Sequence, residues 1–264
     1  MPLPKSAANV LAIAAIGMSV ACPSLVAMDI ILIPGFWLDG SSWDDVVPAL
    51  ERAGHRAHAL TLPGMESPDA DRSAITLRDH IDAVVRVIDT LGPDSGKVIL
   101  VGHSGGGSVA HGAADARPDR VARVVYVDSM PPGDGGLIND ELPAENGEIP
   151  LPDWSLFEAE DMTDLDDDLR EAFRARAIPT PEHVATDRLR LSDDRRYDVP
   201  VTVIACEFSS EMLRQWLEQG HPAVRELARI REVGYVDLPT GHWPQFTRPA
   251  DLGEAILASV APPP

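Results

Sequence analysis

Short apolar runs alternate along most of the chain with segments in which apolar residues recur every three or four positions. The runs are rich in Val and Ile and end at Pro, Gly or acidic residues, which is typical of buried strands in a parallel sheet. They cover residues 29–33, 55–62, 98–101, 120–128, 199–206 and 233–238. The helical spacing covers residues 43–53, 75–91, 211–229 and 249–260. This alternation predicts one α/β domain with a mostly parallel sheet, right-handed crossovers and helices on both faces.

The alternation stops after a strand that ends at Asp128 and resumes near residue 199. The intervening segment shows little strand pattern and holds two helix candidates. One covers residues 164–177, and the other begins at Thr180, which can cap a helix whose first residue is Pro181. An insertion of this kind between two sheet strands predicts a helical cap over residues 131–198. The core is then made of residues 28–130 and 199–264.

Apolar and acidic residues divide the predicted cap into two parts. Trp154, Phe157 and Met162 are candidates for an underside that faces a pocket, although ordinary core packing explains any one of them alone. The acidic stretch from Asp164 to Asp168 lacks the glycine and the bidentate glutamate of a calcium loop. We therefore expect it to be the solvated start of a helix, where acidic side chains are favourable.

Residues 1–27 differ from everything that follows. Lys5 precedes an apolar run from Val10 to Ala21, and small residues come next, which is the layout of a short secretory signal. The run is too short for a stable membrane anchor. Alternatively Met28 is the start of the protein, and residues 1–27 are an upstream extension. The sequence thus predicts a cytoplasmic protein, or an exported one if residues 1–27 are a signal peptide.

The chain of 264 residues has a formal net charge of −20 and a pI near 4.6. So acidic a surface repels nucleic acid and anionic membranes, which excludes both as expected partners. Residues 131–199 contain 19 acidic residues, 7 arginines and no lysine. A substrate that is itself an anion is disfavoured near that segment, although a strongly solvated surface explains the charge equally well.

The two cysteines, Cys22 and Cys206, form no disulfide framework, and no metal-ligand spacing surrounds them. Cys206 ends an apolar strand and is expected to be a buried core thiol. We expect neither a metal nor a cofactor.

The apolar run that begins at Val98 leads directly into Gly102-His103-Ser104-Gly105-Gly106, and a helix-compatible segment follows from Ser108 to Ala116. Gly-x-Ser-x-Gly alone is frequent by chance, but between a strand and a helix it predicts a nucleophile elbow. A serine on so tight a turn needs neighbours without bulk, and Gly102 and Gly106 meet this need. The helix N-terminus then faces an oxyanion that forms at Ser104.

A serine hydroxyl becomes nucleophilic when a base, usually a histidine oriented by a carboxylate, takes its proton. Among the eight histidines, His103 lies inside the elbow, where its side chain points away from that of Ser104. His242 follows the last predicted strand, at the sheet edge where α/β proteins bind ligands. It is also the last candidate in chain order, which matches the order of nucleophile, acid and base that accompanies this kind of elbow. His242 is therefore the predicted base.

The acid has three candidates. Asp128 ends the strand after the elbow helix and so lies on the same sheet edge as Ser104. The conventional place is after the next strand, where Glu207 and Glu211 stand and no aspartate does. We favour Asp128, with Glu207 and Glu211 as alternatives.

An oxyanion hole needs two backbone N–H donors directed at the developing charge. One is expected from Gly105, directly after the nucleophile. The other is expected from the turn after the first strand, with Phe36 as the first choice and Trp37 as the second. A tight bend with aromatic packing is the alternative explanation of that turn.

Together these motifs resemble the serine α/β-hydrolase superfamily, and most closely its small esterase and lactonase-like members. They are, in chain order, Ile33-Pro34-Gly35-Phe36-Trp37 with Trp43, Leu60-Thr61-Leu62-Pro63-Gly64, Gly102-His103-Ser104-Gly105-Gly106 and Gly241-His242-Trp243. The resemblance covers about residues 28–260 and implies the α/β-hydrolase fold, a mobile cap and acyl-enzyme hydrolysis without a cofactor. Pro34-Gly35 stands where many relatives have His-Gly. The acid after the earlier strand matches only a minority of members.

The expected activity is hydrolysis of a small-molecule carboxylic ester or lactone, with Ser104 as nucleophile, His242 as base and Asp128 as orienting acid. Serine at position 104 speaks against the dehalogenase and epoxide hydrolase branches, which have aspartate there. A cofactor-free lyase or a perhydrolase with the same three residues is the alternative within the fold. A ligand receptor or carrier that retains the fold is the non-enzymatic alternative.

Overall fold

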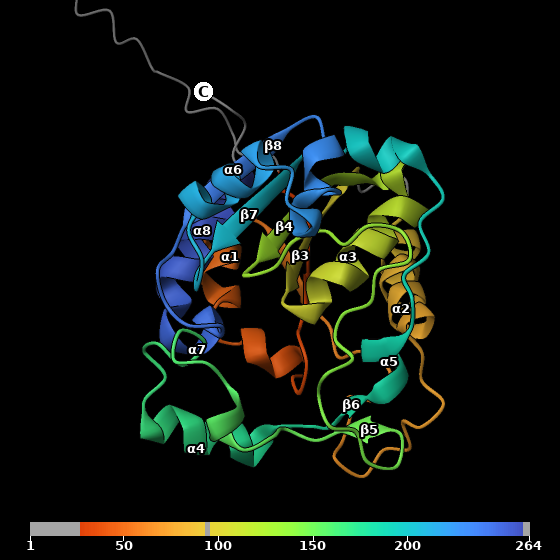
Figure 1. Cartoon of the computed structure of the whole chain (residues 1–264). Coiled ribbons are helices and arrows are strands. Elements are labelled where there is room, and N and C mark those ends of the chain that lie inside the picture. Colours follow the sequence, from red (N-terminus) through yellow and green to blue (C-terminus); the bar gives the residue numbers. More distant parts are fainter. Residues whose placement is uncertain (1–26, 93–95, 261–264) are drawn as a thin grey trace, which may run out of the picture.

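The computed structural model describes residues 27–92 and 96–260, whose arrangement is shown in Figure 1. Six strands form one parallel sheet in the order β2-β1-β3-β4-β7-β8. Their bounds are β1 (Asp29–Ile33), β2 (Arg56–Ala59), β3 (Val98–His103), β4 (Val121–Val127), β7 (Val201–Ala205) and β8 (Val233–Asp237). The predicted parallel α/β sheet is therefore confirmed. The structure does not describe residues 1–26, which make up nearly all of the predicted N-terminal segment and include Cys22. It also does not describe residues 261–264 at the C-terminus.

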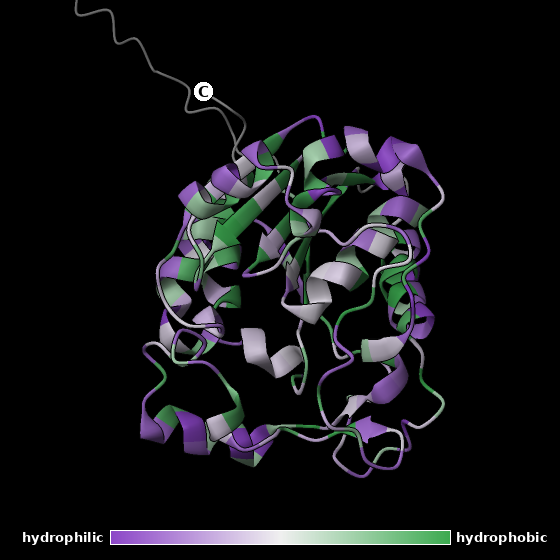
Figure 2. Cartoon of the chain, in the orientation of Figure 1, coloured by the Kyte–Doolittle hydropathy of each residue, from purple (hydrophilic) through white to green (hydrophobic). Residues whose placement is uncertain are grey.

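Alternate residues of each central strand are buried on opposite faces of the sheet. In β1, Ile30 and Leu32 belong to the core under α1 (Val47–Arg52) and α8 (Pro249–Val260), whereas Ile31 and Ile33 belong to the core under α2 (Leu77–Thr90) and α3 (Gly105–Ala116). Figure 2 shows hydrophobic residues in the central strands and hydrophilic ones along α4 (Asp167–Arg176), which belongs to the predicted cap. Both faces of the sheet are thus covered, which explains why its strands are continuously apolar.

The helix predicted over 211–229 is shorter than its pattern suggested. It ends as α6 (Ser210–Glu218), because Gly220 adopts a left-handed φ of 64° and Pro222 follows. Only short 3-10 turns continue from there. The 3-10 turns of the described chain include η1 (Gly40–Trp43), η3 (Pro118–Arg120), η4 (Trp154–Leu156), η5 (Asp194–Asp198), η6 (Pro222–Val224) and η7 (Leu227–Arg229). The short helix α7 (Pro244–Thr247) precedes α8.

Most residues between β4 and β7 form a separate layer along the carboxyl edge of the sheet (Figure 1). The last residues of the predicted cap, in η5 (Asp194–Asp198), instead pack at the C-terminal end of α3, where Arg196 hydrogen-bonds to Asp115 and Arg195 hydrogen-bonds to Asp119. Helix α4 (Asp167–Arg176) begins after Asp166, whose side chain accepts from the amide of Leu169, so the acidic stretch is the capped start of a helix. The layer also contains a two-stranded antiparallel ladder, β5 (Glu148–Ile149) with β6 (Thr180–Pro181), and the short helix α5 (Glu182–Thr186).

The expectation that Thr180 caps a helix is wrong. Thr180 belongs to β6, Pro181 stands at the N-cap position of α5, and the Thr180 hydroxyl oxygen instead accepts from the amide of Trp37 at 2.9 Å. The Thr180 hydroxyl thus makes a hydrogen bond to the turn after β1 instead of the local N-cap hydrogen bond that the sequence predicted. In the ranges that the structure describes, no helix is long and apolar enough to cross a membrane.

Candidate active site

The turn from β3 to α3 holds Ser104 in a strained conformation with φ 52° and ψ −125°. Its glycine neighbours leave no room for side chains. A Cβ on Gly106 would lie 2.6 Å from the carbonyl oxygens of Ile33 and Pro34, and one on Gly102 would lie 2.5 Å from the Gly106 carbonyl oxygen. The sharp turn that the Gly-x-Ser-x-Gly pattern predicts is therefore present, with Ser104 at its apex.

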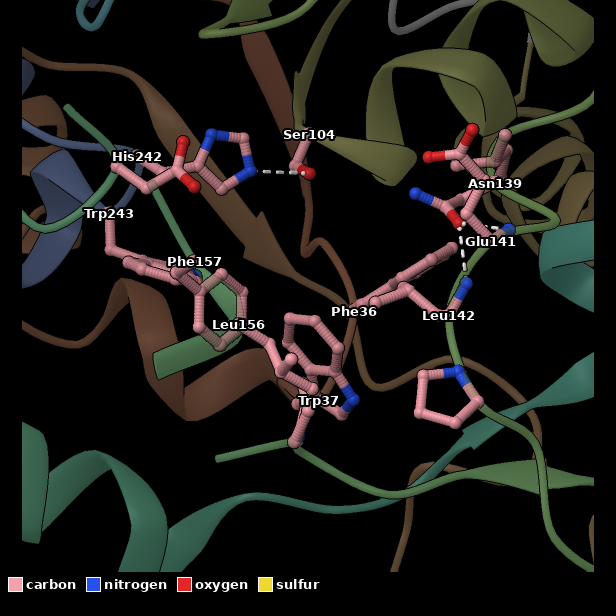
Figure 3. Close-up of a pocket in the computed structure, with 14 residues that line it drawn as sticks. Phe36, Trp37, Ser104, Asn139, Glu141, Leu142, Leu156, Phe157, His242 and Trp243 are labelled. Atoms are coloured by element: carbon pink, nitrogen blue, oxygen red, sulfur yellow. Dashed lines mark hydrogen bonds between the residues drawn. The ribbon is translucent and has the colours of Figure 1, made fainter. Parts of the chain in front are cut away.

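The structure brings Ser104, His242 and Asp128 into one hydrogen-bonded chain, of which Figure 3 shows the serine–histidine part. The Ser104 hydroxyl lies 2.8 Å from Nε2 of His242, and Nδ1 of His242 lies 2.7 Å from Oδ2 of Asp128. Ser104 follows β3, Asp128 follows β4 and His242 lies in the loop after β8, so all three stand at the carboxyl edge of the sheet. This geometry permits proton transfer from Ser104 to the imidazole.

Asp128 is fixed by backbone donors. Its Oδ1 accepts from the amides of Cys206 and Glu207, each at 3.1 Å, and its carboxyl group is buried. Both amides follow β7, so the strand next to β4 supplies the contacts that orient the acid. Cys206 is buried, as predicted, and burial raises the pKa of its thiol.

Burial alone would lower the pKa of His242, but the hydrogen bond and charge of Asp128, with smaller contributions from Glu207 and Asp161, raise it above 6.5. The protonated imidazole that forms when Ser104 gives up its proton is therefore stabilised. This is the electrostatic condition that a general base needs at neutral pH.

The two other candidates for the acid lie in different surroundings. Glu207 places Oε2 3.6 Å from Nδ1 of His242, which is farther than Asp128, and its pKa is raised to about 8 by burial, by a hydrogen bond to Asp161 and by Asp128. Glu211 lies in the first turn of α6 with an exposed side chain. Asp128 is thus the carboxylate that holds the imidazole in this structure.

The candidate oxyanion donors lie next to each other. A Cβ on Gly105 would lie 2.8 Å from the ring of Phe36, so the turn after β1 packs directly against the start of α3. The amide of Gly105 is among the first of α3 and has no partner within that helix. Within the described residues the Phe36 amide also has no hydrogen-bond partner, whereas that of Trp37 donates to Thr180. The amide of Trp37, the second choice for the oxyanion hole, is therefore already used in a hydrogen bond.

Two buried side chains hold the backbone of His242 through a chain of hydrogen bonds. The sequence had assigned no role to either of them. His103 donates from Nε2 to the His242 carbonyl oxygen at 2.6 Å, and Gln245 donates to Nδ1 of His103 at 3.1 Å. Burial lowers the pKa of His103 to about 3, so this histidine stays neutral. Its position in the elbow was the only signal in the sequence, and that position gave no indication of these two contacts.

A cavity of about 470 Å³ opens over Ser104 and is of the size that small-molecule sites have. Figure 3 shows His242, Trp243 and Phe157 on one side of Ser104, and Asn139, Glu141 and Leu142 on the other. Lining residues also include Phe36, Trp37, Leu156 and Asp161. Of the three residues expected on the underside of the cap, Phe157 lines the cavity.

Trp154 and Met162 do not line that cavity, so ordinary core packing, the alternative given above, describes both. Trp154 packs against Phe157, Phe173 and Trp243 and so belongs to the aromatic core between the cap and the loop of His242. Met162 packs on the same core. Periodicity identifies such residues as apolar but gives no indication of which of them reach the cavity.

The donor atoms of Asp128, Glu207 and His242 lie within 4.8 Å of one another, a spacing at which a metal ion can bind. Nδ1 of His242 is, however, already hydrogen-bonded to Asp128, and burial raises the pKa of Glu207 to about 8. The arrangement fits a proton-transfer site better than a metal site.

A model of the alpha/beta hydrolase family matches residues 30–255. The chain belongs to this family. Solved structures with this fold include an extracellular alpha/beta-hydrolase from a Paenibacillus species, at a TM-score of 0.70 and 23% identity, with 88% of this chain and 98% of that chain covered. Polyneuridine aldehyde esterase superposes at a TM-score of 0.66 and 21% identity, with the same coverage.

Curated relatives of this alpha/beta hydrolase carry hydrolase and esterase names. Probable hydrolase R7 from Phoma sp. is 26% identical over 238 residues, which cover 86% of this chain and 96% of the relative. A pyrethroid hydrolase from Sphingobium wenxiniae is 36% identical over 106 residues, and a carbendazim hydrolyzing esterase from Nocardioides sp. is 35% identical over 114 residues. These two matches cover 40% and 43% of this chain but only 37% and 46% of the relatives. The chain is an esterase-like alpha/beta hydrolase.

Proposed function

We propose that this alpha/beta hydrolase cleaves carboxylic esters of small molecules through an acyl-enzyme on Ser104. The observation that carries the proposal is the hydrogen-bonded chain from Ser104 through His242 to Asp128, which opens into a cavity of suitable size. The esterase names among its relatives support the same reaction class.

In this reaction the Ser104 oxygen attacks the ester carbonyl carbon while Nε2 of His242 takes the hydroxyl proton. The N–H groups of Gly105 and Phe36 donate to the oxygen that becomes negatively charged. When the tetrahedral intermediate collapses, His242 gives its proton to the leaving alkoxide and the acyl group stays on Ser104. A water molecule, deprotonated by His242, then releases the acid.

The leaving alcohol receives its proton from His242 and therefore lies on that side of Ser104, beside Trp243 and Phe157. The acyl group then lies on the opposite side, toward Asn139 and Leu142. The aromatic rings favour an apolar alcohol portion. Acyclic esters are the preferred class, since the relatives named above include no lactonase; lactones serve as a second substrate set in the test.

The test is the intact mass of the protein after exposure to a fluorophosphonate, with Ser104→Ala as the matched control. We expect a single adduct on the unmodified protein and none on the variant. Hydrolysis of p-nitrophenyl esters by the variant should fall by about 10⁴-fold or more, since the nucleophile is removed. An unmodified protein that takes no adduct and turns over no ester, yet is stabilised by a ligand that it does not consume, would instead favour the receptor alternative.

A further inference from the structure

Three carboxyl groups surround His242, although the proposed reaction needs only one. Asp128 follows β4, Glu207 follows β7, and Asp161 comes from the cap. Asp128 already holds Nδ1 of His242 at 2.7 Å. Oε2 of Glu207 is buried 3.6 Å from the same nitrogen, and no backbone amide, hydroxyl or basic group of the described residues donates to it. Because a buried carboxyl group is costly, Glu207 calls for a role other than orienting the imidazole.

The carboxyl groups of Glu207 and Asp161 are in hydrogen-bonding contact. Two carboxyl groups can share a hydrogen bond only when one of them carries a proton. Glu207 is the one that does so, because burial, the contact with Asp161 and the charge of Asp128 together raise its pKa to about 8. The Glu207 carboxyl group is therefore the donor in this contact, and Asp161 is the acceptor.

The segment that carries Asp161 also holds the backbone of the histidine loop. The amide of His242 donates to the Asp161 carbonyl oxygen at 2.9 Å, and the amide of Gly241 donates to that of Thr163 at 3.0 Å. The approach is so close that a Cβ on Gly241 would lie 2.3 Å from the Asp161 carbonyl oxygen. A displacement of this segment would therefore disturb the base directly.

We propose that Glu207 is a positioning residue whose neutral carboxyl group ties cap residues 158–163 to the loop that carries His242. The closed cap and the working orientation of the base then depend on one proton. This inference rests on the proposed esterase function and assigns to the same site a control by pH.

The groups that face Glu207 are the carboxylates of Asp128 and Asp161, the imidazole of His242 and the buried thiol of Cys206. Above pH 8 Glu207 loses its proton. Three carboxylates then lie together with no donor between Glu207 and Asp161, and like charges repel. Residues 158–163 separate from the loop, and the base loses two backbone contacts.

The experiment compares kcat and KM from pH 6 to 10 for the unmodified enzyme and for Glu207→Gln, with Ser104→Ala as the blank for spontaneous ester hydrolysis. A glutamine amide donates to Asp161 at every pH. We expect kcat/KM of the unmodified enzyme to fall by about tenfold between pH 8 and 9.5, and that of the variant to stay level over this range. The fall of kcat/KM on the acidic side, which follows protonation of His242, should be the same in both proteins. The proposal is overturned if kcat/KM falls equally in both proteins above pH 8, or if it does not fall in the unmodified enzyme.

Hydrogen exchange provides a second readout that does not depend on turnover. After correction for intrinsic rates, the peptide with Gly241 and His242 should exchange faster at pH 9.5 than at pH 7 in the unmodified protein, but not in Glu207→Gln. In Asp161→Asn, whose amide can donate to an ionised Glu207, the transition should move to lower pH. An unchanged transition in that variant contradicts the role of the carboxyl pair. Failure of the proposed function is distinguishable, since it removes the fluorophosphonate adduct and turnover at every pH.

Discussion

At the scale of single residues, the two carboxyl groups nearest His242 differ through their hydrogen bonds. Asp128 accepts from two backbone amides and from the imidazole of His242. Glu207 lies beside Asp128 and Asp161 with no backbone donor on its buried Oε2, and burial raises its pKa to about 8. Two carboxyl groups that are close in space therefore have different hydrogen-bond partners.

This difference predicts unequal effects of removing each charge. Asp128→Asn should lower kcat by about 10⁴-fold, because an asparagine amide no longer holds the histidine tautomer that can accept the Ser104 proton. Glu207→Gln should cost far less at pH 7, where the group that it replaces is already neutral. Steady-state kinetics of both variants at pH 7 provide the measurement. If Glu207→Gln were the more damaging change, Glu207 would be the orienting acid.

The sequence predicted Ser104 and His242 and favoured Asp128 over Glu207 and Glu211, because each of the three favoured residues stands at or shortly after the end of a recognisable strand. It gave no indication of Asp161, which reaches the site from a loop without periodicity. It also could not assign a role to His103, because its contacts are with residues more than 130 positions away. Chain order locates residues at strand ends, but contacts across the cap depend on tertiary packing.

At the scale of elements, the strand-to-helix elbow depends on the turn after β1. Gly106 lies against the carbonyl oxygens of Ile33 and Pro34, so the end of β1, whose following turn supplies Phe36, and the helix that begins at Gly105 are in close contact. These elements were predictable from patterning, and their boundaries less so. The pattern over 211–229 did not show that the helix ends before Gly220.

This close contact predicts a large effect for Gly106→Ala. The added Cβ would lie 2.6 Å from two backbone oxygens, neither of which can rotate away. We expect a loss of about 1–3 kcal/mol in the free energy of unfolding, measured in urea, together with slower fluorophosphonate labelling. Gly133→Ala is the control, since the nearest atom to its Cβ is 3.7 Å away. Equal stability of both variants would contradict the tight elbow.

At the scale of the whole molecule, the net charge of −20 and the charged residues that line the cavity have the same sign. The lining of the cavity contains Glu141 and Asp161 but neither Lys nor Arg. The field of the protein therefore attracts cations toward the site and repels anions. The aromatic rings beside His242 also favour a positive charge.

A matched pair of substrates tests this field. Acetylcholine and 3,3-dimethylbutyl acetate have nearly the same shape and differ in charge. We expect kcat/KM to be about 3–30-fold higher for the cationic ester at low ionic strength, and the ratio to shrink in 0.5 M salt. Glu141→Gln should also reduce the ratio. A ratio of one or below at low salt would show that charge does not select the substrate.

The position of Asp128 has a consequence for how the protein could diversify. Ser104 and Asp128 follow adjacent strands, β3 and β4, and both precede the cap in the chain. The cap could thus be exchanged as a module between residues 131 and 199 without changing the spacing of nucleophile and acid. A grafted cap would need to supply carbonyl groups for the amides of Gly241 and His242. Recombination at two points, rather than a gradual change of many contacts, would then suffice to give this scaffold a new substrate range.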